Sequence, residues 1–285
     1  MKNEIFGIGW YLRRTYSTQV ISAFYLNNLE IPIIRTHNEN IVHWCGGASV
    51  IGFNQVDKDV ALTTPDQSNN LIALFKVESK NRFANTLHLI EATENLPNIP
   101  SVTFYKDPEG IIFGIKETSI KRPDYFDKYW NKQPTHQQLN NEFKLSDNQR
   151  GLSSLIIRSK NWLQNAKFYQ EKLDLSIIEE SKENIELAID AFTTINFMYG
   201  DETKDKCSSR LSSRQSFVFR CRDVKSVFNK LLDNKLTPLE RHITEDKAGE
   251  IYYFNDLSGQ IFGIQTRTKS TRIEDRYAEK NINYN

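Results

Sequence analysis

The sequence predicts an α+β fold made of four similar units, each a strand, a helix and three further strands. Two internal repeats carry this prediction. Residues 24–34 (FYLNNLEIPII) align with 168–178 (FYQEKLDLSII) at a shift of 144 positions, and 72–77 (IALFKV) align with 216–221 (SFVFRC) at the same shift. The hairpin 104–115 (FYKDPEGIIFGI) returns at 253–264 (YFNDLSGQIFGI) with the turn Asp-x-x-Gly in both copies. The chain is therefore a duplication, and each half splits again into two units.

Each unit opens with a short apolar strand and continues with a capped, amphipathic helix. The first strands are predicted at 10–14, 72–76, 154–158 and 216–221. Their helices follow N-cap residues whose side chains can accept a hydrogen bond from a free helix N–H, namely Ser17, Ser79, Asn161 and Asp223. Segments such as 40–53 and 184–197, together with the two hairpins, supply the remaining strands.

The repeats also predict the domain organisation. A first domain of two units spans 1–117 and a second domain of two units spans 151–268. A polar linker containing several aromatic residues lies between them at 118–150, and a polar tail occupies 269–285. The sequence leaves open whether each half pairs its own two units or exchanges units with the other half.

Charge and composition exclude several classes of function. Lys and Arg (37) balance Asp and Glu (36), so no global field favours nucleic acid or an anionic membrane. No apolar run is long enough to span a bilayer, and the N-terminal stretch lacks the apolar core of a signal peptide. Three widely spaced cysteines fit a reducing compartment. We therefore expect a cytoplasmic protein with neither a nucleic-acid partner nor a membrane partner.

At this point the residues carry a family resemblance. The unit order, the Phe-Tyr pair near the helix end and the closing Asp-x-x-Gly hairpin resemble the vicinal oxygen chelate superfamily. This group includes glyoxalase I, bleomycin-resistance proteins, fosfomycin-resistance enzymes and extradiol dioxygenases. Residues 154–175 and 218–264 carry the resemblance best. It implies two tandem glyoxalase/bleomycin-resistance-like domains whose curved mixed sheets form clefts, and in such clefts a divalent metal is usual.

The family's metal ligands are absent from the matching positions. Metal-dependent members need a His or Gln early in each first strand and a Glu in each closing strand. Here the first-strand positions are Trp10, Ile72, Ser154 and Ser216, and the closing-strand positions are Gly52, Gly114, Asn196 and Gly263. None of these is a carboxylate, imidazole or thiolate. His37, His43 and Cys45 form a cluster that we interpret as structural, with substrate contact and metal binding as alternatives. No catalytic residue, metal or other cofactor is predicted, and the three glycines are expected to leave the ion's space free.

Other side chains make the clefts candidate ligand sites. Four residues beyond each first-strand position the chain has a cation, giving the set Arg14, Lys76, Arg158 and Arg220. These cations share a strand face with the lost ligand positions, so a pair of them could grip an anion. The alternative is that they pair with loop carboxylates. If each half pairs its own units, the first cleft is apolar and roomy (Trp10, Ile72, Gly52, Gly114) and the second is polar (Ser154, Ser216, Asn196). Trp10 could instead fill the first cleft as core, and the polar residues could satisfy one another.

The sequence thus predicts a metal-independent protein that binds an organic small molecule, anionic or aromatic, for sequestration or sensing. Bleomycin-resistance-type proteins would be the model for sequestration. Two alternatives stay open: a metal-dependent enzyme resembling a glyoxalase lyase or an extradiol dioxygenase, and a protein–protein interaction module. The oligomeric state is also open between a monomer, pseudo-dimeric by duplication, and a homodimer.

Overall fold

The computed structural model describes residues 4–46, 49–83, 101–118, 148–189, 193–200, 209–243 and 249–267, with Leu96, Ile99 and Ser146 besides. Nearly all of the predicted linker and the predicted tail lie outside these residues, so those two predictions stay untested. In the part of the chain that the structure describes, no helix is long and apolar enough to cross a membrane.

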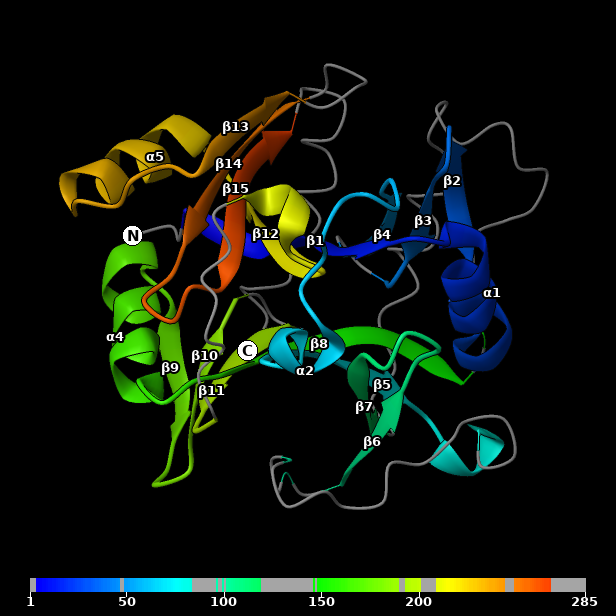
Figure 1. The fold of residues 1–285 in the computed structure, drawn as a ribbon. Coiled ribbons are helices and arrows are strands. Elements are labelled where there is room, and N and C mark those ends of the chain that lie inside the picture. The colour runs from blue at the N-terminus through cyan, green and yellow to red at the C-terminus, as the bar shows by residue number, and fades with distance from the viewer. Residues whose placement is uncertain are drawn as a thin grey trace.

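Units 1, 3 and 4 have the predicted strand, helix and three further strands, whereas the described part of unit 2 has its first strand, a short 3-10 turn after Ser79 and two further strands (Figure 1). Unit 1 comprises β1 (Ile5–Thr15), α1 (Thr18–Leu29), β2 (Ile33–His37), β3 (Asn40–Trp44) and β4 (Val50–Gln55). After α2 (Pro65–Ser68), unit 2 comprises β5 (Leu71–Val77), the 3-10 turn η1 (Lys80–Phe83), β6 (Val102–Lys106) and β7 (Ile112–Glu117). Unit 3 comprises β8 (Gln149–Arg158), α4 (Trp162–Leu173), β9 (Ser176–Glu180), β10 (Asn184–Ala188) and β11 (Thr194–Met198). After η3 (Arg210–Ser212), unit 4 comprises β12 (Gln215–Cys221), α5 (Val224–Asp233), β13 (Glu240–Ile243), β14 (Gly249–Asn255) and β15 (Ile261–Arg267).

The helix ends confirm the predicted duplication at the level of single residues. Ser17, Asn161 and Asp223 are the N-caps of α1, α4 and α5, although only the Asp223 side chain accepts a backbone hydrogen bond, from Lys225 N. Helices α1 and α4 both end on a left-handed residue, at Glu30 and Asp174, which are 144 positions apart. The repeat therefore extends to backbone conformations that an ordinary side chain adopts at a cost.

The sheets join units from opposite halves of the chain. Sheet A has the strand order β13-β14-β15-β12-β1-β4-β3-β2, which pairs unit 4 with unit 1. Sheet B has the order β6-β7-β5-β8-β11-β10-β9, which pairs unit 2 with unit 3. In each sheet the two first strands run antiparallel at the centre, β1 against β12 and β5 against β8. Among the described residues, the strands of 1–117 and those of 151–268 are divided between the two sheets, and the division of the chain at the linker stays a prediction.

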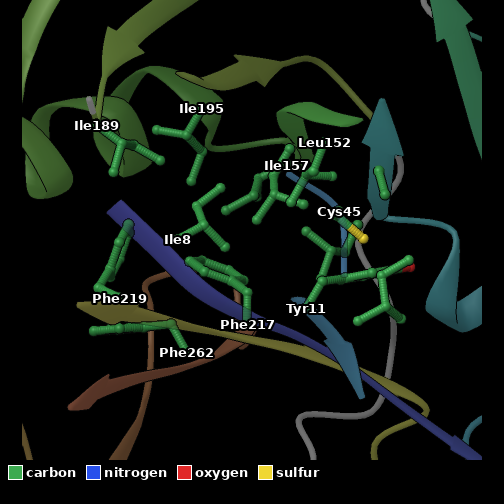
Figure 2. Close-up of a cluster of buried hydrophobic side chains, with 14 of the residues drawn as sticks. Ile8, Tyr11, Cys45, Leu152, Ile157, Ile189, Ile195, Phe217, Phe219 and Phe262 are labelled. Atoms are coloured by element: carbon green, nitrogen blue, oxygen red, sulfur yellow. The ribbon is translucent and has the colours of Figure 1, made fainter. Parts of the chain in front are cut away.

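The main hydrophobic core lies between the two sheets and draws on both of them. Figure 2 shows Ile8, Phe217, Phe219 and Phe262 of sheet A facing Leu152, Ile157 and Ile195 of sheet B. We call the face of each sheet that contributes to this core its inner face. The other side, the outer face, carries separate small apolar clusters on sheet A and on sheet B. Because side chains alternate along a strand, every residue of a first strand belongs to one face or the other.

The two Asp-x-x-Gly turns tie the sheets together within each half. The turn between β6 and β7 belongs to sheet B, and its Asp107 accepts a hydrogen bond from Arg13 of sheet A at 2.7 Å. The turn between β14 and β15 belongs to sheet A, and its Asp256 accepts from Asn165 of α4 at 2.9 Å and from the Tyr169 hydroxyl at 3.1 Å. Strand pairing therefore joins the halves to each other, whereas the turns join the two units inside a half.

Candidate functional site

The exchange of units changes which predicted site residues meet. In sheet A, Trp10 pairs with Val218 and Ser216 pairs with Leu12, so Trp10 and Ser216 are diagonal neighbours across β1 and β12, with Cα atoms about 7–8 Å apart. In sheet B, Ile72 pairs with Ile156 and Ser154 pairs with Leu74, which makes Ile72 and Ser154 the corresponding diagonal pair. The expected division into an apolar first cleft and a polar second cleft is wrong, because each centre combines one apolar with one polar first-strand residue.

The expectation of free space over the glycines is also wrong. A Cβ atom on Gly114 would lie 2.2 Å from Leu74 Cδ2, and one on Gly263 would lie 2.9 Å from Ile251 Cγ2. On Gly52, the same atom would lie 3.0 Å from Leu12 Cδ2 and 3.2 Å from the Trp10 ring. Neighbouring apolar side chains have moved into the volume that a closing-strand side chain would occupy. These three positions therefore present hydrocarbon rather than an open floor.

On sheet A the outer face is apolar around Trp10. The Trp10 side chain is half-buried and packs on two clusters, one around Trp44 and Val50 and the other around Leu12, Val218 and Tyr253. Its Nε1 donates to Gln265 Oε1 at 3.1 Å. Trp10 thus serves as core between the two units of sheet A, which is the alternative that the sequence had left open.

The matching cations do not converge. Arg14 lies beside Arg214, since Arg14 N donates to Arg214 O at 2.9 Å, and Arg220 lies six residues further along β12. At about 3.3 Å per residue this places their Cα atoms about 20 Å apart. Arg14 is buried and donates to Ser213 O at 3.0 Å and to Ser216 Oγ at 3.5 Å. The antiparallel pairing of the first strands therefore keeps the two cations of sheet A too far apart to grip one anion together.

The same separation holds on sheet B. Arg158 N donates to Asn70 O at 2.8 Å, and Lys76 lies six residues beyond Asn70 along β5, so their Cα atoms are again about 20 Å apart. Arg158 packs against Gly200, where a Cβ atom would meet Arg158 Cβ at 2.6 Å. Lys76 and Arg158 therefore lie at opposite ends of the outer face.

A polar network occupies the unit 3 side of the sheet B centre. Asn196 Nδ2 donates to Ser154 Oγ at 2.7 Å and lies 3.4 Å from Glu186 Oε1. Thr194 Oγ1 is 3.0 Å from Ser154 Oγ and 2.5 Å from Glu186 Oε1. A hydroxyl has one proton, so Thr194 can donate to one of these two acceptors at a time, and the Ser154 hydroxyl donates to Leu155 O at 3.3 Å. Ser154 Oγ thus accepts from Asn196, and Glu186 Oε1 accepts from Thr194 and Asn196. Ser154 and Asn196 satisfy one another, as the second interpretation of the sequence had it.

An apolar wall adjoins this network on the same face. Ile156 is the register partner of Asn196, and Met198 follows Asn196 on the same side of β11. Both belong to a cluster with Ile72, Leu74, Phe104 and Ile112, and Ile99 and Val102 pack against it. A few oriented polar groups beside a hydrophobic surface are typical of small-molecule sites.

Glu186 and Thr194 were missed by the sequence analysis. Glu186 lies on β10, outside the first and closing strands to which the family pattern directs attention, and Thr194 lies in the closing strand β11 but two residues before the ligand position. The residue spacing contained a signal. Glu186 lies in a strand whose side chains alternate between buried and half-buried, and Thr194 lies two residues before Asn196, so Thr194 and Asn196 project from the same face of their strand. Without the β10–β11 register, nothing in the sequence brings Glu186 opposite Asn196.

The His43 cluster is structural in its geometry. His43 is fully buried, with Nδ1 2.7 Å from Ile31 O and Nε2 2.7 Å from Ser22 Oγ. Burial lowers the pKa of His43 to about 4, so the neutral ring donates from Nδ1 and accepts from Ser22. Cys45 is buried in the main core (Figure 2). Within the described residues, no group of three or more His, Cys, Asp or Glu side chains could hold a metal ion.

Comparisons with known proteins agree with this fold. No protein-family model and no curated protein sequence matches the chain. Among solved structures, glyoxalase I from Zea mays is 10% identical and matches with a TM-score of 0.59, covering 98% of this chain and 96% of that chain. A Bacillus subtilis protein described only provisionally as a dioxygenase is 12% identical, with a TM-score of 0.61 and coverage of 99% and 91%. The cppA protein from Streptococcus pneumoniae is 11% identical, with a TM-score of 0.52 and coverage of 93% and 99%. The chain has the vicinal oxygen chelate fold in its tandem, four-unit form.

Proposed function

We propose that this protein binds an organic small molecule on the outer face of sheet B without the help of a metal ion. The proposal rests on one observation: the positions where the fold would place metal ligands are apolar and filled at the three glycines, but polar at Asn196 and Ser154. At Gly52, Gly114 and Gly263 apolar side chains fill the space, while Asn196 and Ser154 form an oriented polar network. Fold alone does not determine activity, so the argument rests on this site.

The lining supports binding rather than metal-assisted chemistry. Ser154 and Asn196 present neutral oxygen and nitrogen atoms, and only one carboxylate, Glu186, joins them. A divalent metal that polarises a substrate needs several anionic or imidazole ligands with an open coordination position. The neighbouring Ile156 and Met198 belong to a packed cluster and are 0% and 7% exposed, so a hydrocarbon or aromatic group of the ligand would lie at the edge of this cluster. Sequestration or sensing in the cytoplasm, by a monomer or a homodimer, would use such a site.

The test is native mass spectrometry, in the presence of a chelator, on protein purified from its host. We expect a small organic molecule to remain bound to the wild-type protein and to be lost from the Asn196→Leu variant. Leucine has the same branched outline as asparagine, although it is bulkier, and it cannot hydrogen-bond Ser154. The matched control is Ser216→Ala, which changes the corresponding polar residue of sheet A and should leave the bound mass unchanged.

Two results would overturn the proposal. A stoichiometric divalent ion that remains on the untreated protein and disappears with Asn196→Leu would favour a metal-dependent enzyme of the glyoxalase or dioxygenase kind. A co-purifying protein, with no small organic mass, would favour the interaction module.

A further inference from the structure

Helix α1 presents an exposed face that carries no charge. Its buried side, with Ile21, Tyr25 and Leu29, belongs to the main core. Its 12 residues include no Asp, Glu, Lys, Arg or His. The side chains on the opposite side are all exposed, namely Gln19, Val20, Ala23, Leu26 and Asn27. A surface helix normally directs charged and polar residues to solvent, but here Val20 is 55% exposed and Leu26 is 38% exposed.

The matching helix of the second half shows that the fold does not require this apolar face. Helices α1 and α4 lie at opposite sides of the molecule (Figure 1). The exposed face of α4 has one apolar residue, Leu163, at the position that matches Gln19. The positions that match Val20, Ala23, Leu26 and Asn27 hold Gln164, Lys167, Gln170 and Glu171, which are exposed as well. Because Lys167 and Glu171 form an ion pair there at 3.6 Å, charged side chains are compatible with this face of the helix.

The ends of α1 also lack compensating groups of their own. The first turn of α1 has no acidic residue, its last turn has no basic residue, and the Ser17 side chain does not cap it. In contrast, α4 has Lys172 in its last turn, and α5 has both the Asp223 cap and Lys230. The ion pair of Glu30 and Arg82 beyond the end of α1 adds no net charge. The partial positive charge at the start of α1 and the partial negative charge at its end would therefore be stabilised by an antiparallel neighbour.

The exposed face of α1 is symmetric about Ala23. At 3.6 residues per turn, Val20 and Leu26 lie about 60° to either side of Ala23, and Gln19 and Asn27 lie about 40° to either side. A second α1 packed antiparallel about Ala23 would place Val20 level with the partner's Leu26, and Gln19 level with the partner's Asn27. The two amides could then exchange hydrogen bonds. Alanine at the centre lets two helix axes approach to about 8–10 Å.

We propose that α1 packs antiparallel against α1 of a second copy of this chain, in a homodimer with twofold symmetry. In such a contact each surface meets itself, so any charge near the axis would face a charge of the same sign. A neutral face avoids this repulsion, which the lysine at the matching position of α4 would cause.

The size of the face sets the expected strength of the dimer. A helix of this length is about 18 Å long and about 10 Å across. It therefore offers much less than the about 800 Å² per partner of a stable interface, and we expect weak, reversible association. This inference does not depend on ligand binding at sheet B, which can fail or succeed separately.

The experiment is analytical ultracentrifugation of the full-length protein between about 1 µM and about 1 mM, the range in which weak complexes dissociate. The mean mass of the wild-type protein should rise from 33.2 kDa towards twice that value. Ala23→Glu and Ala23→Lys should each weaken the association by at least about tenfold, because like charges then meet at the axis. An equimolar mixture of the two variants should associate at least about tenfold more tightly than either alone, because opposite charges then meet.

Controls separate association from folding. Glu and Lys are good helix formers, and the matching position of α4 already holds Lys167, so both variants should fold and show the wild-type circular dichroism spectrum. Leu163→Lys places the same charge on the exposed face of α4 and should leave the association unchanged.

Each other outcome contradicts the proposal. A wild-type protein that stays a monomer up to about 1 mM shows that the chain does not form this dimer. A dimer that survives both substitutions of Ala23 uses another surface. Two monomeric variants whose mixture also stays monomeric rule out a twofold axis at Ala23. If the chain stays a monomer but co-purifies with a different protein that Ala23→Glu releases, the face belongs to that partner instead.

Discussion

The two halves of the chain make matching contacts with different side chains. In the first half, the turn residue Asp107 is paired with the buried guanidinium of Arg13. The position 144 residues after Arg13 is Ile157, and the equivalent turn residue Asp256 is surrounded by neutral donors from Asn165, Tyr169 and Ser258. Burial raises the pKa of Asp256, and those hydrogen bonds oppose the rise. The Asp-x-x-Gly turn therefore contacts the other unit of its half through an ion pair in the first half and through neutral donors in the second half.

A second matched set shows the same trend. His43 and its partner Ser22 are buried in the first half, and the positions 144 residues on are Leu187 and Ala166, which are buried as well. The two replacements are coordinated, because a hydroxyl without the imidazole would be an unpaired polar group in a core. The comparison shows that the fold requires two buried side chains in contact at these positions. The pair can be polar or apolar, provided that both residues change together.

The largest expected effect comes from removing Arg13. Arg13→Ile introduces at position 13 the residue type found at the matching position of the second half, Ile157. It leaves the Asp107 carboxylate buried beside Tyr11 and Tyr25 without this cation. Breaking a buried ion pair from one side costs about 3–5 kcal/mol, and we expect a loss of that size in the free energy of unfolding measured with urea. The double variant Arg13→Ile/Asp107→Asn should recover part of it. A single-variant loss below about 1 kcal/mol would contradict the importance of the pair.

The next effect concerns the pH dependence of stability. The pKa of His43 falls from 6.5 to about 4 on folding, so the unfolded chain takes up the proton first as the pH falls below 6.5. The contribution of His43 is complete above pH 6.5 and declines towards pH 4, by about 3 kcal/mol in total at 1.36 kcal/mol per pKa unit. Urea unfolding between pH 7 and pH 4 measures this change.

The double variant Ser22→Ala/His43→Leu is the matched control for the pH effect. It installs the pair found in the second half and should flatten the pH profile in this window. A wild-type profile as flat as that of the variant would show that His43 does not carry the dependence.

A smaller effect is expected at the second turn. Asp256→Asn keeps one oxygen for the N–H groups of Ser258 and Gln260 but turns an NH₂ group towards the donors of Asn165 and Tyr169. We expect a loss of about 1–3 kcal/mol in the free energy of unfolding, because a mismatched hydrogen bond is replaced and no buried cation is left behind. The equivalent Asp107→Asn should cost more, since it leaves the longer contact with Glu109, at 3.4 Å, as the carboxylate that still pairs with the buried Arg13. If the two substitutions cost the same, the ionic and neutral versions of the contact are energetically alike.

The smallest effect is expected at Gly52, the position matching Asn196. A methyl group on Gly52 approaches Leu12 and Trp10 to 3.0–3.3 Å, which small shifts of these side chains relieve. Gly52→Ala also gains about 0.5–1 kcal/mol from the reduced freedom of the unfolded chain. We expect thermal denaturation to show a change within about 1 kcal/mol. A much larger loss would mean that Leu12 and Trp10 are held rigidly over the glycine.

The sequence by itself determined the elements and their repetition. Apolar periodicity, the caps at Ser17, Asn161 and Asp223, and the two Asp-x-x-Gly turns are local properties, and each is found where the sequence predicts it. The lack of metal ligands at positions such as Trp10 and Gly114 is equally local. These features depend on neighbours within a few residues, so a single sequence is sufficient to identify them.

Only the tertiary structure decided which units pair and what the site contains. The first strands β1, β5, β8 and β12 offer similar rows of backbone donors and acceptors, so strand pattern alone does not choose between pairing within a half and pairing across the halves. That choice separates Arg14 from Arg220 and fills the space over Gly114. It also leaves the outer face of unit 3 as the one that holds Ser154, Asn196 and Glu186 together. The physical reason is register, because the partner of a strand residue is set by another strand and not by its own sequence.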